Sequence, residues 1–231
     1  YLCDEATGWM PDLKDIESKI TANTRGIVVI NPNNPTGTFL DFADAERIAA
    51  ACLDAGAMLV VDEAYAEFRR AGTRTAFELL AKYPNVIVSR TMSKAFALAG
   101  ARLGYAVAAD TRVIDVLQVV RLPYHLSAVT QAVALTALEF ADELQAQVDL
   151  LRSERDALAS WLSDQGYVVA PSDANFILFG MFDDRAAVWQ RLLDQGVLIR
   201  QTGPAGWLRV SVGTPEENAM FRQALLTARE G

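Results

Sequence analysis

The sequence predicts an α/β fold in which a mostly parallel, helix-sandwiched sheet is followed by a smaller C-terminal α+β domain. Short apolar, β-branched runs alternate with segments whose apolar residues recur at helical spacing. Continuously apolar runs of this kind are typical of strands covered on both faces, as in parallel sheets. Towards the C-terminus the runs become shorter. We therefore predict a large domain over 1–155 and a small domain over 156–231.

Each predicted element follows from a local pattern. In the large domain the apolar runs predict strands at 26–30, 57–61, 85–89 and 104–108. Helical spacing predicts helices at 42–55, 76–82, after Asp110 and over 127–163. In the small domain we expect strands at 167–170, 175–179, 197–200 and 207–212, with helices at 185–195 and 215–229. Thr214, Pro215 and Glu217 form the pattern of a capping box at the start of the last helix.

Composition excludes several classes of function. The 231 residues carry a net charge of -8, which argues against a nucleic-acid surface. No apolar run approaches the roughly 18 residues of a membrane span, so no membrane partner is expected. Two cysteines and one histidine, His125, argue against a disulfide framework, a metal site and a Ser-His-Asp triad. Two reduced thiols and no signal peptide favour the cytoplasm, and we expect the chain to lack an N-terminal part because it opens at Tyr1.

Three polar clusters directly follow predicted strands, at 31–37, 62–65 and 89–104. Open α/β sheets bind ligands at the carboxyl ends of their strands, so this placement indicates a site. Taken singly, the first cluster is also typical of an ordinary turn. Asp62, in the second cluster, is equally typical of a helix N-cap. A carboxylate at the end of a buried strand nevertheless requires a partner, and we expect a cation near it.

The third cluster contains Lys94, one of only four lysines against seventeen arginines. It lies among small and apolar residues, where a lysine either extends to solvent or is kept for reactivity. Two hydroxyls, Thr91 and Ser93, and a guanidinium nearby are suited to a phosphate group. Together the clusters supply an amine, a carboxylate, a phenol, an amide and a phosphate site. Pyridoxal 5′-phosphate is the cofactor that uses all of these groups.

Five motifs in a fixed order resemble the class I/II aminotransferases of fold type I, and among them the histidinol-phosphate aminotransferases. They are NPNNPTG from residue 31, DEAY from 62, RTMSKAFALAGARLGY from 90, SDANFILF from 172 and GWLRVSVGTPEEN from 206. The motifs extend over essentially the whole chain. The resemblance implies the pyridoxal-phosphate-binding large domain, incomplete at its N-terminus, followed by the small domain.

The resemblance assigns Lys94, Asp62 and Tyr65 to catalysis. Lys94 would form the Schiff base with the cofactor and then move the substrate proton, while Asp62 would pair with the pyridine nitrogen. Asn34 and Tyr65 would bond the ring oxygen, and Ala64 would lie against one ring face. The residues implied for the cofactor phosphate are Thr91, Ser93 and Arg102.

The resemblance also implies three substrate-binding residues. Arg209 would bind a carboxylate through its planar guanidinium. Arg200 would help to bind the phosphate of histidinol phosphate, and Asn175 would orient the substrate or the neighbouring backbone. The N-terminal segments that complete the site in the family cannot be located in this sequence. If the molecule begins at Tyr1, we therefore expect weak cofactor binding and little turnover.

The activity expected from the resemblance is reversible amino transfer between histidinol phosphate and 2-oxoglutarate or glutamate, in histidine biosynthesis, by a cytoplasmic homodimer. Other hypotheses remain open within enzymes: an aromatic amino-acid aminotransferase of the same subfamily, or a threonine-phosphate decarboxylase. A non-catalytic, cofactor-sensing module of a transcription regulator and a catalytically incompetent fragment are the remaining alternatives.

Overall fold

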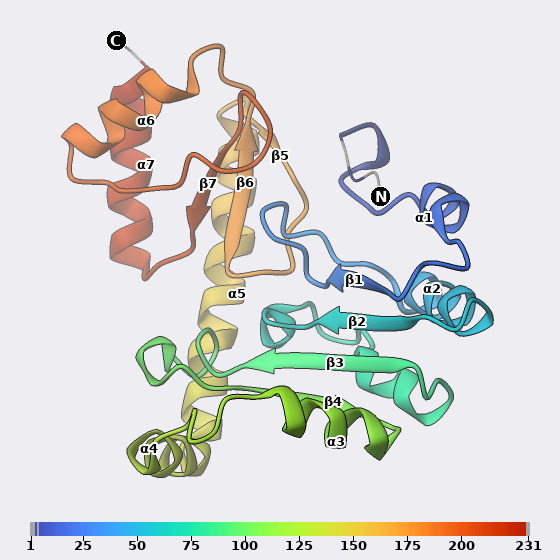
Figure 1. Ribbon diagram of the computed structural model, residues 1–231. Helices are drawn as coiled ribbons and strands as arrows, with labels where there is room; N and C mark the ends of the chain where they lie inside the picture. The colour runs from blue at the N-terminus through green and yellow to red at the C-terminus, as the bar shows by residue number, and fades with distance from the viewer. Residues whose placement is uncertain (1–2, 4, 230–231) are drawn as a thin grey trace.

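The computed structural model describes residue 3 and residues 5–229, and its strands form two separate sheets (Figure 1). The first sheet has the order β1 (Gly26–Ile30), β2 (Met58–Asp62), β3 (Val86–Thr91) and β4 (Gly104–Ala108). The first three strands are parallel and β4 is antiparallel to β3. The prediction of a mostly parallel α/β sheet is confirmed.

The strand register brings the three polar clusters together at one edge. Ile30 lies opposite Asp62, and Asp62 lies opposite Ser89. The carboxyl ends of β1, β2 and β3 therefore stop side by side. Because β4 is antiparallel, its first residue, Gly104, pairs with Thr91 at the same edge.

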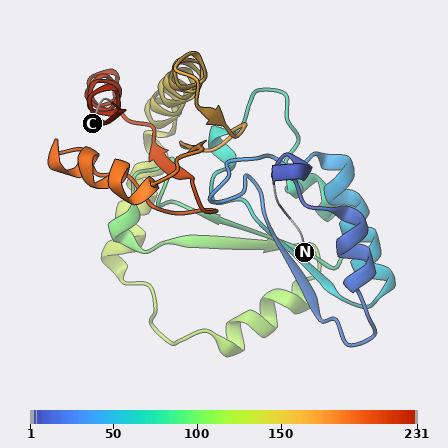
Figure 2. The same ribbon diagram turned by 90° about the horizontal axis from the view of Figure 1, so that it is seen from above.

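Helices cover one face of this sheet. The core there contains side chains from α1 (Leu13–Lys19), α2 (Phe42–Asp54), the short 3-10 helix η3 (Ala76–Ala81) and the strands. Figure 2 shows α3 (Thr111–Val120) on the side of the sheet away from α1 and α2. None of the residues of α3 is buried, and Tyr105 and Val107 of β4 are 48% and 36% exposed. Among the described residues, coverage of the two faces is therefore unequal.

The second sheet is antiparallel and small, with the order β5 (Val168–Val169), β6 (Phe176–Gly180) and β7 (Leu208–Ser211). Its core includes residues of α5 (Ala141–Asp164), α6 (Arg185–Asp194) and α7 (Pro215–Arg229). The predicted capping box of α7 is present: Glu217 N–H donates to Thr214 Oγ1 at 3.2 Å, and Thr214 N–H donates to Glu217 Oε2 at 2.8 Å.

Three local predictions need correction. The predicted helix over 127–163 is two helices, α4 (Ala128–Glu139) and α5, which are separated at Phe140. The predicted strand at 197–200 is wrong, because only Arg200 makes a β-bridge, to Arg209. Residues 76–81 form a 3-10 helix rather than an α-helix. Within the part of the chain that the structure describes, no helix combines the length and apolarity needed to cross a membrane.

Two arginine side chains join the segments that follow β2 to those that precede β6. Arg155 of α5 is 2% exposed and donates to the carbonyls of Phe68 and Ala174. Arg70 forms an ion pair with Asp173, which is 4% exposed. Because α5 continues through residue 155, the boundary between 1–155 and 156–231 stays a prediction.

Candidate active site

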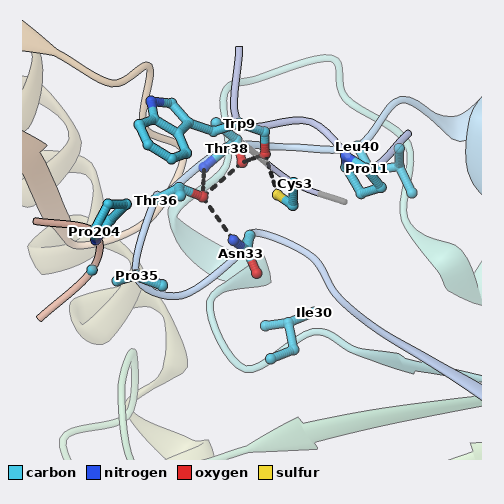
Figure 3. Close-up of a pocket in the computed structure, with 11 residues that line it drawn as sticks. Cys3, Trp9, Pro11, Ile30, Asn33, Pro35, Thr36, Thr38, Leu40 and Pro204 are labelled. Atoms are coloured by element: carbon cyan, nitrogen blue, oxygen red, sulfur yellow. Dashed lines mark hydrogen bonds between the residues drawn. The ribbon is translucent and has the colours of Figure 1, made fainter. Parts of the chain in front are cut away.

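The turn after β1, which carries Asn34, is held from behind by side-chain hydrogen bonds. Asn33 Nδ2 donates to Thr36 Oγ1 at 2.8 Å, and the hydroxyls of Thr36 and Thr38 are 2.8 Å apart. Thr38 Oγ1 then donates to the carbonyl of Trp9 at 3.2 Å (Figure 3). These contacts lie beside a cavity of about 300 Å³. The polar residues of the turn therefore fix its shape, and the exposed Asn34 side chain takes no part in these contacts.

Asn34 contacts a residue that lies 175 positions away in the sequence. Its Oδ1 accepts a hydrogen bond from Arg209 Nη1, on β7 of the second sheet. The Arg209 guanidinium also lies over the ring of Phe176, 4.6 Å from its centroid. This contact brings the first polar cluster and the predicted substrate-binding arginine into one site.

Tyr65 lies between the two groups of predicted residues. It is 8% exposed, and its ring packs edge-on against Phe176 with the centroids 5.1 Å apart. Burial raises the pKa of the Tyr65 phenol; the charge of Arg209 lowers it, and that of Asp62 raises it. Lys94 Nζ is 5.6 Å from the centroid of the same ring. Asp62, Lys94 and Arg209 are therefore all neighbours of Tyr65.

Asp62 and Lys94 have few partners in the described chain. Asp62 is half-buried at the end of β2, and its Oδ1 accepts a hydrogen bond from Ala64 N–H at 3.0 Å. Among residues 3 and 5–229, neither Asp62 nor Lys94 makes an ion pair. A half-buried carboxylate and an exposed amine without ionic partners are both available to a ligand.

The hydroxyls predicted to bind phosphate lie together at the end of β3. Thr91 Oγ1 and Ser93 Oγ are 2.8 Å apart, and Ser93 N–H donates to Thr91 Oγ1 at 3.1 Å. Met92 N–H donates to the carbonyl of Leu103, the neighbour of Arg102, at 3.1 Å. Arg102 itself is exposed, has left-handed backbone geometry with φ 53°, and donates to Ala99 O at 3.0 Å.

A buried ion pair fixes the ends of β2 and β3 relative to each other. Glu63 is 2% exposed and accepts from Arg90 Nε at 3.0 Å and from Arg90 Nη2 at 2.6 Å. It also accepts from Thr75 Oγ1 and from Ala76 N–H. Since Glu63 follows Asp62 and Arg90 precedes Thr91, this pair stabilises the relative positions of the two clusters.

Arg200 and Arg209 face one cavity of about 450 Å³ together with Asn34, Trp189, Gln201 and Thr202. Burial lowers the pKa of Arg209; the Tyr65 phenol acts against this shift, and the positive charge of Arg200 adds to it. Arg209 Nε is buried and has no hydrogen-bond partner among the described residues. The cavity therefore offers cationic donors to an anion.

Asn175 is the predicted site residue that the structure connects least to the others. Its backbone carbonyl accepts from Val212 N–H at 2.9 Å, at the end of the pairing between β6 and β7. In the described part of the chain, no hydrogen bond joins its side chain to another predicted site residue. Its role stays a prediction.

The comparison with protein families decides the membership of the chain. The model of the family "Aminotransferase class I and II" matches residues 1–225. The chain belongs to the class I and II aminotransferases.

Curated relatives within this family carry more specific names. Histidinol-phosphate aminotransferase of Thermobifida fusca is 67% identical over 202 residues, which are 87% of this chain and 54% of that protein. The protein of the same name from Bifidobacterium longum is 54% identical over 98% of this chain and 65% of its own length. This aminotransferase chain thus spans between half and two thirds of the length of these relatives.

Solved structures agree with the predicted fold. The histidinol-phosphate aminotransferase of Sinorhizobium meliloti, solved in complex with pyridoxal-5'-phosphate, has a TM-score of 0.85 and 29% identity. The alignment covers 95% of this chain and 61% of that one. The histidinol-phosphate aminotransferase of Clostridium acetobutylicum has a TM-score of 0.90 at 21% identity, over 99% and 70% of the two chains, which shows the same fold. The prediction of fold type I is confirmed.

Two residues of the candidate site were not predicted from the sequence. Phe176 contacts both Tyr65 and Arg209, and Trp189 lines the cavity beside Arg200. Phe176 lies inside a quoted motif, but an apolar residue in a predicted strand gives no signal beyond the core. Trp189 lies in a predicted helix, and its contact with residue 199 depends on a turn whose geometry the sequence does not specify.

Proposed function

We propose that this chain is the cofactor- and substrate-binding part of a pyridoxal-phosphate-dependent aminotransferase that acts on histidinol phosphate and 2-oxoglutarate. The observation that carries the proposal is that Asp62, Lys94 and Arg209 all lie close to Tyr65, at the carboxyl edge of a parallel sheet. These three groups can serve a ring nitrogen, an aldehyde and a substrate anion respectively. The names of the relatives support the choice of substrate.

The residues present fit pyridoxal 5′-phosphate. Asp62 is a half-buried carboxylate without an ionic partner among the described residues, as a protonated pyridine nitrogen requires. Thr91 and Ser93 present adjacent hydroxyls, and Arg102 follows at the same edge, so these three would hold the phosphate. When bound, the cofactor supplies an aldehyde and an electron-accepting ring.

The chain's own residues then have distinct tasks. The amine of Lys94, exposed and without an ion pair in the described chain, carries the proton that leaves the substrate carbon. Tyr65 keeps its phenolic proton over a wider pH range because burial raises its pKa, and it can therefore donate a hydrogen bond to the ring oxygen. Asn34 is a second donor for that oxygen through its amide nitrogen, because its Oδ1 is already bound to Arg209.

Substrate binding is proposed for the cavity lined by Arg200 and Arg209. Arg209 retains a buried Nε donor that has no partner in the described chain, which suits a carboxylate or phosphate oxygen. Arg200 adds a second positive charge for a phosphate monoester. Asn175 is proposed to orient the substrate, and this role rests only on the resemblance of its motif to the aminotransferase family.

We also propose that the intact enzyme is a cytoplasmic homodimer that takes only small molecules as substrates. Large apolar side chains are exposed along α3, α4 and the segment between them, where a second copy would cover them. They include Val119 at 84%, Leu122 at 76%, Tyr124 at 100% and Val129 at 72% exposure. Analytical ultracentrifugation of the full-length protein is expected to give a dimer; a monomer at micromolar concentration contradicts this part.

Trapping of the cofactor tests the chemistry. Borohydride reduction of the full-length protein with pyridoxal 5′-phosphate, followed by peptide mass spectrometry, is expected to place the covalent adduct on Lys94. Lys94→Arg removes adduct and turnover, whereas the control Lys82→Arg, at an exposed lysine paired with Glu46, retains both. An adduct on another lysine contradicts the assignment of Lys94.

Substrate preference tests the specific activity. The full-length protein is expected to have a far higher kcat/KM with histidinol phosphate than with phenylalanine, when 2-oxoglutarate is the acceptor. The opposite order favours an aromatic amino-acid aminotransferase. Release of carbon dioxide from threonine phosphate without amino transfer favours the decarboxylase.

A further inference from the structure

Arg200 lies on a segment that pairs with the small sheet at one point only. Arg200 N–H donates to Arg209 O at 3.0 Å, and Arg209 N–H donates to Arg200 O at 2.9 Å. Both peptide groups of Arg200 are therefore turned towards β7. In an extended chain the carbonyls of adjacent residues point to opposite sides, so the carbonyl of Ile199, the residue before Arg200, is turned away from β7.

Ile199 is 5% exposed, and a carbonyl buried to this extent needs a donor. The donor is the indole of Trp189 in α6: its Nε1–H donates to Ile199 O at 2.8 Å. Among the described residues no other hydrogen bond to this carbonyl is present. The segment before Arg200 is thus held from one side by β7 and from the other by Trp189.

The same indole lines the cavity that contains both arginines. Trp189 faces it together with Asn34, Arg200 and Arg209. Neither arginine makes an ion pair within the described chain, and Arg200 lies near enough to Arg209 to lower its pKa. Two like charges repel, so a fixed backbone is needed to keep both guanidinium groups in one cavity before an anion arrives.

We propose that Trp189 is a positioning residue that holds Arg200 beside Arg209 and thereby sets the affinity for the phosphate of the substrate. The proposal rests on the proposed function. Loss of the indole N–H leaves the Ile199 carbonyl buried without a partner. The segment then turns this carbonyl towards water, and Arg200 moves with it because a single β-bridge opposes the movement.

Trp189→Phe in the full-length, cofactor-loaded protein tests this. We expect KM for histidinol phosphate to rise about tenfold, equivalent to about 1.4 kcal/mol, with kcat within about twofold of the parent. The matched control is Trp161→Phe: Trp161 of α5 is half-buried in the same core, and its indole N–H donates no hydrogen bond among the described residues. This control is expected to leave KM unchanged.

A double-mutant cycle separates positioning from a general loss of structure. In an Arg200→Gln background, Trp189→Phe is expected to add almost nothing to KM, because the arginine it positions is gone. Additive effects overturn the proposal, as does an equal effect of Trp161→Phe. Replacement of Trp189 by benzothienylalanine removes the N–H and keeps the shape, so it gives the same test if the phenylalanine variant does not fold.

Phosphate binding makes the test independent of turnover. Calorimetry of the full-length protein with inorganic phosphate is expected to show weaker binding after Trp189→Phe and unchanged binding after Trp161→Phe. If the parent does not transaminate histidinol phosphate but this difference is present, the proposed function fails and the role of Trp189 stands. If the parent is active and the difference is absent, the role of Trp189 fails alone.

Discussion

Gly37 is the position where the turn after β1 touches the segment between β5 and β6, and alanine there has two separable effects. Its φ is 83°, and an added Cβ would overlap the Ser172 hydroxyl and lie 2.7 Å from Ser172 Cβ. Ser172 cannot swing aside, because its Oγ donates to Phe176 O at 2.6 Å and accepts from Ala174 N–H at 3.1 Å. Left-handed backbone costs alanine about 1–2 kcal/mol, and overpacking adds about 1–3 kcal/mol.

Gly72 supplies a control with the same backbone geometry. Its φ is also 83°, but an added Cβ there has no atom within 4 Å. Gly72→Ala is therefore expected to show the backbone cost alone, and Gly37→Ala to exceed it by about 1–3 kcal/mol of unfolding free energy. Urea denaturation followed by circular dichroism, with m values checked for equality, measures the difference. Equal losses in the two variants would refute the reasoning that Ser172 is immovable.

The remaining predictions concern charges and a helix cap. Arg90→Met leaves the Glu63 carboxylate buried without its cation and is expected to cost about 3–5 kcal/mol in urea denaturation; Arg47→Met, at an exposed pair, serves as the control and should cost far less. Burial raises the pKa of the Glu67 carboxyl, so this group binds its proton more tightly in the folded protein than in the unfolded chain. The stability gained from the bound proton is present below the unfolded pKa of 4.5 and is lost as pH rises through the folded pKa. Glu67→Gln should therefore raise the melting temperature at pH 7 and leave it unchanged at pH 4; the opposite pH dependence contradicts this. Thr214→Ala removes the N-cap of α7 and should cost about 1 kcal/mol, whereas a loss below about 0.3 kcal/mol argues that the cap is dispensable.

Elements with a clear local pattern were predictable. The strand at 26–30 has the predicted bounds, and the last helix begins and ends where its capping box and spacing place it. In both cases the pattern within the element itself contains enough information. Likewise, the positions of Asn34, Asp62 and Lys94 after successive strands were sufficient to expect them at one edge, because parallel strands end on the same side.

Elements whose form depends on distant contacts were not predictable to the same degree. The run at 197–200 has the composition of a strand, but its backbone bonds to the end of α6 through Val197 N–H, to the indole of Trp189 and, by one β-bridge, to Arg209, rather than forming a ladder. The helix α1 was missed, although Asp12 accepts from the N–H groups of Lys14 and Asp15 as its N-cap. An aspartate after a proline is equally typical of a turn, and the helix is only 7 residues long.

The contact between Asn34 and Arg209 could not be predicted from the sequence, although each of the two residues was predicted to belong to the site. Each residue was assigned separately, one to the cofactor and one to the substrate, and no local pattern joins positions 175 residues apart. Their hydrogen bond occupies Nη1 of Arg209, so an anion bound through Nη1 would compete with Asn34, whereas an anion bound through Nε, which has no partner among the described residues, would not. Under the proposed function, a substrate anion that takes Nη1 would free the Asn34 carbonyl oxygen. The charges of Arg209 and Asp62 both shift the pKa of the Tyr65 phenol. An anion bound at Arg209 would therefore also change the electrostatic field at this phenol. Under the proposed function, the cofactor edge and the substrate cavity therefore share Asn34, Tyr65 and Arg209 and are not two independent sites.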